Sequence, residues 1–374
     1  MTGPLSVRTI SAAEQLDFIR ECASASYLQC PSWGVMPPRW TPESVGWFDG
    51  LSVLRGVGLV LYRRVPVVGS LAYLGEGPVV DWAALGAENV LRPLLAYLHT
   101  RAVFSVKVAP NLVLQRWGVE TLRSVLRSDS ARRLRDVPPD IVSDVAADVV
   151  AALREQGWTQ YEAPGPGFGG QMHPRYRSHV PLSPGADPAD RLDAQWRRNL
   201  RKASTSGVVV TTGGSGDLPV FYEMYAETAG RDGFPPLPLE FFQRMWRSLR
   251  SEEEGRLELY LASREGRAYA AALRTRVGWA MSYTHGASSA AGREWRPSNA
   301  MQWRMLTDAH SGGADVYDLR GISDTLDPSD PLFGLLRFKL GLGGDAVEMA
   351  GEWDYPLRPL KHRVVAAYRG RRVR

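Results

Sequence analysis

The spacing of hydrophobic and polar residues alternates along the chain between the period of a helix and that of a strand. The first half is predicted to contain, in order, a helix over 12–22, an irregular Pro- and Trp-rich segment over 26–49, strands over 53–63 and 71–74, a helix over 81–99 and a strand over 103–108. Pro93 lies inside the second helical pattern, which therefore predicts either a kinked helix or two short ones.

The second half repeats this order of elements. Strands are predicted over 256–262, 268–277, 279–285 and 316–319, with a helix over 297–310 before the last of them. Two successive sets of strands, helix and strand predict an α/β (α+β) protein made of two similar units. Each unit is expected to be a mixed sheet flanked by helices.

Three further segments complete this outline. An amphipathic helix is predicted over 238–250, and its aromatic side chains are expected in the core. The Gly- and Pro-rich passages 163–170 and 211–217 are expected to be loops, the first of them between two domains.

Length and composition indicate a two-domain protein of the reducing cytoplasm. With 374 residues the chain exceeds the usual size of one domain, and 44% hydrophobic and 23% charged residues are typical of a globular protein. The first residues lack the pattern of a signal peptide, and no apolar run approaches the roughly 20 residues of a membrane-spanning helix. Cys22 and Cys30 are the only cysteines, so no disulfide framework is expected.

Several common chemistries are excluded by their missing motifs. The sequence has no HExxH, GxSxG or GxxxxGK[ST] motif. A GxGxxG match at 165–170 is interrupted by Pro166 and followed by residues that do not predict a helix, as a dinucleotide site requires. His173 and His179 lie six residues apart around Pro174, which is poor spacing for metal ligands. Neither a metal nor a nucleotide cofactor is expected.

The most basic segment spans residues 193–204. On a helix, Arg197 and Arg201 share one face, and Arg198 and Lys202 share the adjacent one. This ridge suits the phosphates of RNA, of a nucleotide diphosphate or of a lipid diphosphate, although a solvated helix face would look the same. Lysine is rare in this chain, which makes a retained lysine a candidate for a specific role. The lysines are Lys107, Lys202, Lys339 and Lys361.

A second cluster lies at 317–344, where a strand ends at Leu319 and an Asp- and Gly-rich loop leads into a short helix. Arg337 and Lys339 fall near the end of that helix. They either stabilise the negative end of the helix dipole or belong to a ligand site, since α/β folds bind ligands where strands lead into helices.

Six blocks, spread along nearly the whole chain, resemble actinobacterial FemX- and VanK-type proteins of the FemABX family. They are ASYLQCPSWG (25–34), ESVGWFDG (43–50), AYLGEGPVVDW (72–82), QWRRNLRKA (195–203), 225–246 and 317–357. The resemblance implies two tandem domains similar to the GNAT acyltransferase fold. It places an acceptor domain at 1–174 with 343–374, and an aminoacyl-tRNA domain at 175–342.

The resemblance also implies an activity and its substrates. Such proteins transfer an amino acid from charged tRNA to an amine of UDP-MurNAc-pentapeptide or lipid II, with neither ATP nor a metal. Charged tRNA and a peptidoglycan precursor are therefore the expected partners. No integral membrane segment is expected, and contact with a membrane surface is expected if lipid II is the acceptor.

The family pattern assigns roles to individual residues. Lys202 matches a cation that grips the precursor's phosphate, with Arg201 as its neighbour, and Lys339 matches a lysine at the reacting centre or the tRNA end. The position of Asp318 and Asp324 in the strand-to-helix loop, rather than the family pattern, makes them candidates for the general base, with the terminal ribose of the tRNA itself as the alternative. The expected substrate-binding residues are Trp33, Arg39, Arg198, Arg201, Lys202, Tyr283 and Arg320.

One departure from the family pattern leaves the acceptor open. Pro37 stands where the family usually has a lysine, and the segment 171–180 is unusually rich in His and Arg. A peptide natural product, such as a peptidyl-nucleoside antibiotic, is therefore an alternative acceptor. Two other functions remain: an acyl-CoA transferase, although the sequence lacks the [QR]-x-x-G-x-[GA] loop for a pyrophosphate, and a non-catalytic RNA-binding protein.

Overall fold

The computed structural model describes residues 3–36, 39–161 and 173–372, and the chain divides into two compact units. Unit 1 comprises Met1–Arg116, Ile141–Arg175 and Glu348–Arg374, and unit 2 comprises Trp117–Asp140 and Tyr176–Val347. The expected domains were divided near 174 and 343, with 117–140 in the first. Residues 117–140 belong to unit 2 because their apolar side chains share a core with the segment 322–346.

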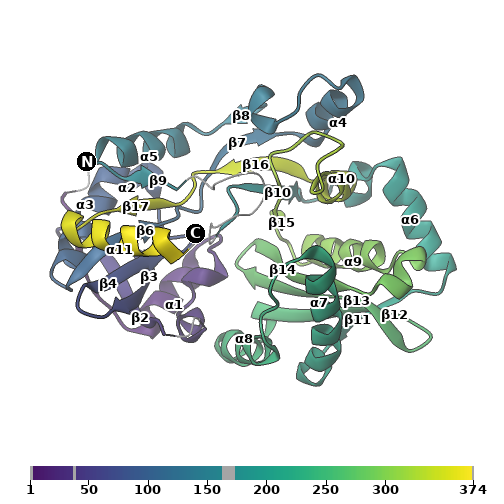
Figure 1. The fold of residues 1–374 in the computed structure, drawn as a ribbon, viewed down its shortest axis with the longest axis horizontal. Helices are drawn as coiled ribbons and strands as arrows, with labels where there is room; N and C mark the ends of the chain where they lie inside the picture. Colours follow the sequence, from purple (N-terminus) through teal and green to yellow (C-terminus); the bar gives the residue numbers. More distant parts are fainter. Residues whose placement is uncertain (1–2, 37–38, 162–172, 373–374) are drawn as a thin grey trace. The chain divides into compact units, whose positions relative to one another are not determined.

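Unit 1 is a mixed sheet with the strand order β1-β2-β3-β4-β6-β17-β9 (Figure 1). Its strands are β1 (Ser6–Thr9), β2 (Thr41–Phe48), β3 (Leu54–Val65), β4 (Gly69–Leu74), β5 (Val79–Val80) against β3, β6 (Val103–Val108), β9 (Thr159–Gln160) and β17 (Trp353–Tyr355), and β7 (Val113–Trp117) pairs with β8 (Ile141–Val142). Neighbouring strands are antiparallel except β4 and β6, which are parallel. Its helices are α1 (Ala12–Glu21), α2 (Trp82–Leu85), α3 (Ala87–His99), α5 (Asp144–Glu155) and α11 (Pro359–Arg372).

In unit 1, one expectation needs correction and one alternative is decided. The segment 26–49 is not wholly irregular, because β2 pairs with β1 and β3 and buries Val45, Trp47 and Phe48, and this packing outweighs its proline and tryptophan content. Of the two alternatives for 81–99, the pair of short helices is confirmed, but Pro93 does not separate them. The break falls at Gly86, whose φ of 74° suits glycine, while Pro93 lies inside α3.

Unit 2 contains the strand order β11-β12-β13-β14-β15-β10-β16. These are β11 (Val209–Gly213), β12 (Leu257–Arg264), β13 (Arg267–Val277), β14 (Ala280–Ser288), β15 (Val316–Gly321), β10 (Tyr176–Pro181) and β16 (Asp345–Met349). The predicted strands of the second half are confirmed as β12 to β15. Part of 211–217, expected to be a loop, is instead the end of β11, while 163–170 lies outside the described residues.

Helices cover both faces of the unit 2 sheet (Figure 1). α6 (Ala194–Thr205) and α9 (Pro297–Ser311) pack on one face, and α7 (Leu218–Asp232) and α8 (Leu239–Glu252) on the other; α4 (Val119–Ser128) and α10 (Phe333–Gly341) lie elsewhere in the unit. The helix predicted over 238–250 is α8, and its buried residues include Phe242 and Met245, as expected for a core-facing stripe.

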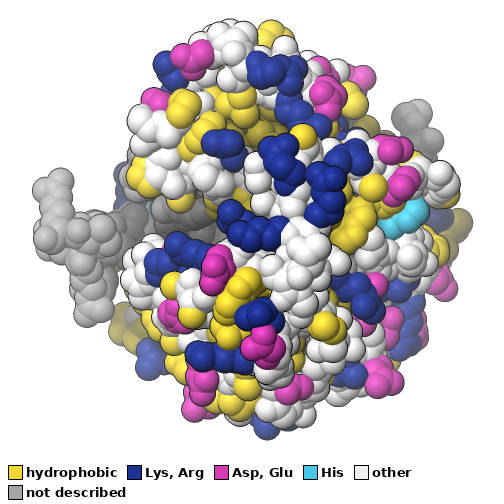
Figure 2. All heavy atoms as spheres, turned by 90° about the vertical axis from the view of Figure 1, so that its right-hand side faces the viewer, with side chains coloured by type: hydrophobic (Ala, Val, Ile, Leu, Met, Phe, Trp, Pro, Cys, Tyr) yellow, Lys and Arg dark blue, Asp and Glu magenta, His cyan; other side chains and the backbone are white. Residues whose placement is uncertain are grey.

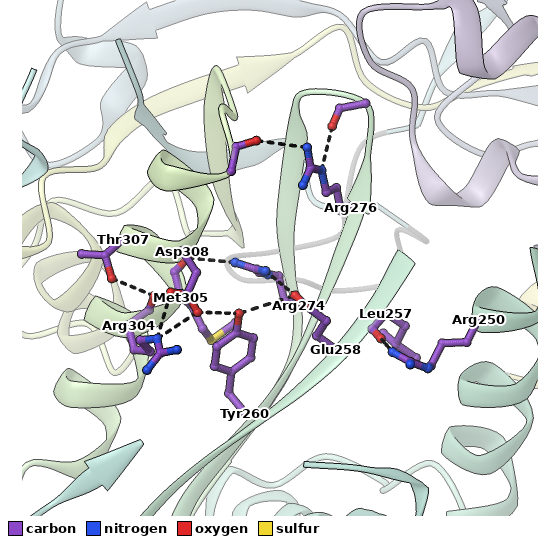
Figure 3. Close-up of polar contacts among 12 residues, drawn as sticks. Arg250, Leu257, Glu258, Tyr260, Arg274, Arg276, Arg304, Met305, Thr307 and Asp308 are labelled. Carbon is purple, nitrogen blue, oxygen red and sulfur yellow. Dashed lines mark hydrogen bonds and ion pairs between the residues drawn. The ribbon is translucent and has the colours of Figure 1, made fainter. Parts of the chain in front are cut away.

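A buried network of hydrogen bonds and an ion pair connects α9 to the sheet (Figure 3). Arg274 of β13, only 5% exposed, pairs with Glu258 of β12 and donates to the carbonyl oxygen of Met305 at 3.1 Å. The Tyr260 hydroxyl donates to Asp308 of α9 at 2.9 Å. A buried cation needs such partners, because an unpaired charge in the interior is strongly destabilising.

Candidate functional site

The two parallel strands at the centre of unit 2 separate part-way along their length. β14 and β15 pair at Ala280–Val316, Met281–Tyr317 and Ser282–Asp318, the pairs found in the described part of the chain. Beyond them β14 continues beside β13, and β15 continues beside β10. The carboxyl ends of diverging parallel strands are where open α/β sheets bind ligands.

Asp318 lies at this point of separation, close to the side chains of two arginines and one histidine. Its carboxylate is 3.5 Å from Arg177 Nη1, 3.7 Å from His179 Nε2 and 3.4 Å from Arg320 Nη1. The backbone N–H of Arg320 also donates to Asp318 Oδ1 at 2.6 Å. His179 on β10 is the direct cross-strand partner of Asp318. Among these described side chains two guanidinium groups face one carboxylate, an arrangement that suits an anionic or oxyanionic group.

Lys339 of α10 also contacts this end of β15. The side chain is 5% exposed, and Nζ donates to the carbonyl oxygens of Leu319 and Gly321, each at 2.7 Å, with Arg320 O at 3.4 Å. Burial lowers the pKa of Lys339 to about 7, the Asp318 carboxylate opposes this shift, and Arg320 adds to it. The hydrogen bonds of Lys339 go to β15. They do not go to the carbonyl groups at the end of its own helix, as the helix-dipole alternative would require.

The number of hydrogens on Lys339 limits what it can do. A neutral amine has two N–H groups, and the two short bonds to β15 use both of them. The ammonium form has a third N–H, which is left for Arg320 O or for an oxygen of a ligand. At a pKa of about 7 both forms are populated near neutral pH.

A cavity of about 320 Å³ lies on the β14 side of the separation. Its floor includes the buried Met301 and Gln302 of α9, and its mouth includes the exposed Arg231 and Phe234. Phe338, which precedes Lys339 on α10, also lines it. The remaining lining residues are Thr228, Asp232, Tyr283, Gly286, Ala287, Ser288 and Ser298.

His285 lies on β14 next to this region and is a neutral group at physiological pH. Burial lowers its pKa to about 4, and the positive charge of Arg320 acts in the same direction. Its ring packs against Phe242 with centroids 5.2 Å apart, and against Tyr225 at 6.4 Å. An uncharged imidazole fits this aromatic surrounding better than a cation beside Arg320.

The basic segment 193–204 forms α6, as predicted, with Trp196 and Ala203 buried. Arg197, Arg198, Arg201 and Lys202 are all exposed on it. None of the four forms an ion pair with any residue in the described part of the chain; Arg198 instead donates to the Gln195 side chain at 2.8 Å. Figure 2 shows Lys and Arg side chains gathered on the face of the molecule that includes this helix. The ridge therefore has charge available for phosphates.

The model of the FemAB family matches residues 10–277 and 251–369. The chain belongs to the FemAB family. Among its relatives is a lipid II:glycine glycyltransferase of Staphylococcus epidermidis, 22% identical over 93% of this chain and 92% of the relative. The aminoacyltransferase FemB of the same species is 22% identical over 82% and 84% of the two chains.

Solved structures confirm the predicted fold class for this FemAB-family chain. The crystal structure of FemX matches with a TM-score of 0.77, at 19% identity, over 96% of this chain and 99% of FemX. A tandem GNAT protein from the clavulanic acid biosynthesis pathway matches with a TM-score of 0.53, at 13% identity, over 94% and 98% of the two chains. Two mixed sheets flanked by helices are what the sequence pattern predicted.

Unit 2 of the FemAB-family chain brings together some of the predicted site residues and separates others. Asp318, Arg320 and Lys339 meet at the end of β15, and Tyr283 lies on the neighbouring strand. Asp324 is instead held in an ion pair with Arg133 at 3.0 Å. Arg198, Arg201 and Lys202 are placed on α6, a different element from this strand end.

The residues predicted in unit 1 have a separate setting. Trp33 packs edge-on against Tyr27, with ring centroids 5.1 Å apart, and beside the buried cluster of Leu59, Leu61 and Tyr73. Arg39 is exposed and adopts a φ of 67°. Pro37, which departs from the family pattern, lies outside the described residues.

Sequence reasoning missed Arg177, His179 and His285 as members of this site. The signal for the first two was the polar content of the segment 171–180, which proves to include β10, a strand beside β15. Within residues 3–36, 39–161 and 173–372, no three His, Cys, Asp or Glu side chains are grouped to hold a metal ion. No helix in these ranges is long and apolar enough to cross a membrane.

Proposed function

We propose that this protein is an aminoacyltransferase that joins an amino acid carried by tRNA to an amine of a peptidoglycan precursor, either UDP-MurNAc-pentapeptide or lipid II. Membership of the FemAB family and relatives named as glycyl- and aminoacyltransferases support the acyl-transfer class. The observation that carries the proposal is the cationic end of β15, where the buried Lys339 amine and Arg320 surround a point suited to a developing oxyanion.

The reaction is a transfer between an activated ester and an amine. The acceptor nitrogen attacks the ester carbonyl, a C–N bond forms, and the C–O bond to the terminal ribose breaks. The ammonium proton of the acceptor passes to a base, and the departing ribose oxygen takes up a proton. We assign the oxyanion contact to the third N–H of Lys339 and to Arg320, and the base to Asp318 or to the ribose. The ester is already activated, so ATP, a metal and a cofactor are not needed.

Asp318 fits a proton-accepting role better than Asp324 does. Asp318 lies at the separation of β14 and β15, whereas the Asp324 carboxylate accepts both contacts from Arg133, at 3.0 and 3.1 Å. We assign the α6 ridge, formed by Arg197, Arg198, Arg201 and Lys202, to the phosphates of one of the two substrates. Because charged tRNA is a cytoplasmic substrate, we place the reaction in the cytoplasm.

The test is the transfer of radiolabelled amino acids from a mixed pool of charged tRNAs, with and without RNase. Parallel reactions contain UDP-MurNAc-pentapeptide, lipid II, a small peptidyl-nucleoside or an acyl-CoA donor in place of the tRNA. RNase-sensitive labelling of a precursor is the expected result. Labelling of the small peptide alone would assign the protein to the modification of a peptide natural product. Binding of tRNA without any labelling would make it a non-catalytic RNA-binding protein.

A further inference from the structure

The turn between β3 and β4 in unit 1 carries a valine where glycine or asparagine is usual. The turn is closed by the N–H of Val68, which donates to the carbonyl oxygen of Val65 at 3.2 Å. Val67, at its second central position, has a φ of 66°, a backbone conformation that β-branched residues rarely adopt. The side chain is also fully exposed, so it adds nothing to the core. An exposed apolar residue in a strained backbone conformation indicates a role outside the packing of unit 1.

The helix α11 lies beside this turn. Lys361 Nζ of α11 donates to the carbonyl oxygen of Val68 at 2.8 Å. Just before the helix, the N–H of Arg358 donates to the carbonyl oxygen of Phe104 in β6 at 2.9 Å, and α11 packs against β6 (Figure 1). The turn and the start of α11 therefore lie together at the end of the unit 1 sheet where β4 and β6 begin.

The start of α11 adds two more exposed apolar side chains at this end. Leu360 is 78% exposed and Val364 is 63% exposed. Because they are four residues apart, they lie on the same side of the helix. A single exposed apolar residue is ordinary on a protein surface, but a group of them with polar neighbours is typical of an interaction site.

The charged residues around these side chains are positive. Arg63 and Arg64 lie in β3 just before the turn, and Arg363 lies between Leu360 and Val364. All three arginines are exposed, and none forms an ion pair within the ranges that the structure describes. The sequence has no Asp or Glu in 63–70 or in 357–374. We call this set the turn–α11 surface; its members are Arg63, Arg64, Val67, Leu360, Arg363 and Val364.

The mixture of cations and apolar side chains indicates the kind of partner. RNA would be attracted by the arginines but would gain nothing from three exposed aliphatic side chains. The centre of a protein–protein interface is depleted of charge, whereas here the arginines lie among the apolar residues. An anionic lipid surface takes up both, because its phosphates attract the cations and its acyl boundary accepts the apolar side chains.

We propose that the turn–α11 surface binds the protein to an anionic membrane surface. Val67, Leu360 and Val364 enter the boundary between headgroups and acyl chains, and the arginines contact lipid phosphates. The inference goes beyond the proposed function and does not depend on it, since binding to lipid needs neither tRNA nor acceptor. Where the acceptor is lipid II, the same surface brings the protein to the membrane that holds its substrate.

The test is flotation of the full chain with vesicles of phosphatidylcholine, either alone or mixed with phosphatidylglycerol. Binding is expected only with phosphatidylglycerol, and it should weaken as salt is added. Val67→Gly should weaken it about 3- to 10-fold, because one apolar side chain is lost from the lipid boundary. The Tm should not fall, since glycine adopts this φ without strain. Leu51→Ala is the control, as Leu51 is 85% exposed in the turn at the other end of β3, and should change little.

A second variant tests the charge. Changing the three arginines of the turn–α11 surface to Gln should weaken vesicle binding about 100-fold, since each cation near an anionic surface contributes about five-fold. The control removes the same charge from exposed arginines that are each paired with an acid three or four positions away, and its effect should be small. These control residues are Arg20, Arg92 and Arg132.

Several results would overturn the inference. They are equal binding to the two kinds of vesicle, equal weakening by Val67→Gly and Leu51→Ala, or equal weakening by the two triple variants. Loss of tRNA binding without loss of vesicle binding in the surface variant would assign these arginines to RNA. A dimer in solution that Val67→Gly dissociates would assign the surface to a second copy of the chain. Because the vesicles are tested without substrates, failure here is distinct from failure of the transfer assay.

Discussion

The side-chain nitrogen of Lys339 lies 2.7 Å from the carbonyl oxygen of Gly321, the last residue of β15. This bond joins a helix to the end of a strand that carries Asp318 and Arg320. Because the same nitrogen also bonds Leu319 O, it fixes the backbone on both sides of Arg320, whose φ is 61°. Lys339 thus both holds the strand end in place and presents an N–H there.

Replacing Lys339 by Met should reduce kcat about 10²- to 10³-fold with a small change in KM, the effect typical of losing one oxyanion donor. Two carbonyl oxygens also lose their donor, so the free energy of unfolding should fall by about 1–3 kcal/mol. Steady-state kinetics and urea unfolding check the two effects separately. Lys361→Met is the control, since Lys361 also donates to a carbonyl oxygen, that of Val68, but at the surface. Equal activity of the two variants would remove Lys339 from the mechanism.

The low pKa of Lys339 predicts how stability changes with pH. Burial lowers the pKa from its ordinary 10.5 to about 7. Between these values the unfolded chain binds a proton that the folded chain does not, so the free energy of unfolding should rise with pH in this window. The rise should be at most about 1.4 kcal/mol per pH unit, and it should be absent in Lys339→Met. Below pH 7 the two proteins should change in parallel. Urea unfolding at pH 6 to 10 makes the comparison, and parallel curves throughout would show that the lysine titrates normally.

Asp318→Asn and Asp324→Asn should have different effects on kcat. The first removes the carboxylate that faces Arg177, His179 and Arg320, and kcat should fall about 10²-fold or more, as for the loss of a general base. Asp324 is paired with Arg133, so the second should leave kcat near the wild-type value and cost stability only. Single-turnover transfer from charged tRNA measures both. A wild-type rate for Asp318→Asn would leave the tRNA ribose as the base.

The buried pair of Arg274 and Glu258 gives a prediction on stability alone. Arg274→Met should lower the free energy of unfolding by about 2–4 kcal/mol, since Glu258 and the carbonyl oxygen of Met305 both lose their partner. Glu258→Gln should cost less, because Glu258 is 32% exposed and water replaces part of the interaction. Denaturant unfolding of both variants tests this order, and a larger loss in Glu258→Gln would contradict it.

The sequence predicted correctly those elements whose residue pattern depends on the element alone. The strands β12 to β15, the helix α8 and the cationic face of α6 all follow from local periodicity. The grouping at the end of β15 does not, because Arg177, His179 and Lys339 come from three elements that meet only in the folded sheet. Register decides that His179 faces Asp318, and no spacing along the chain encodes register.

The same limit explains two of the corrected features. β2 is set by pairing with β1 and β3, which its own proline and tryptophan content conceals. Residues 117–140 were expected in the first domain because they follow it in the chain. They are held in unit 2 by packing such as that of Trp117 and Leu122 with Leu336, which lies far away in the sequence.

Removing the positive charges of the α6 ridge should weaken substrate binding in a salt-dependent way and leave the rate of the chemical step unchanged. In the variant with Arg198, Arg201 and Lys202 all changed to Gln, KM should rise for one phosphate-bearing substrate while kcat stays near wild type. The substrate whose KM rises, charged tRNA or the precursor, identifies what the ridge binds. If it is RNA, the slope of log affinity against log salt should fall by about 0.7–0.9 for each phosphate that no longer meets a cation, which is roughly 2–3 for the triple variant.

A matched control keeps this result from reflecting net charge alone. Arg20, Arg92 and Arg132 are also exposed, but each is paired with an acidic residue three or four positions away. Changing all three to Gln removes the same charge from sites whose field is already neutralised, so KM and the salt slope should change little. Equal shifts in the two triple variants would mean that the protein attracts its substrate by overall charge, and the ridge would then be a solvated helix face.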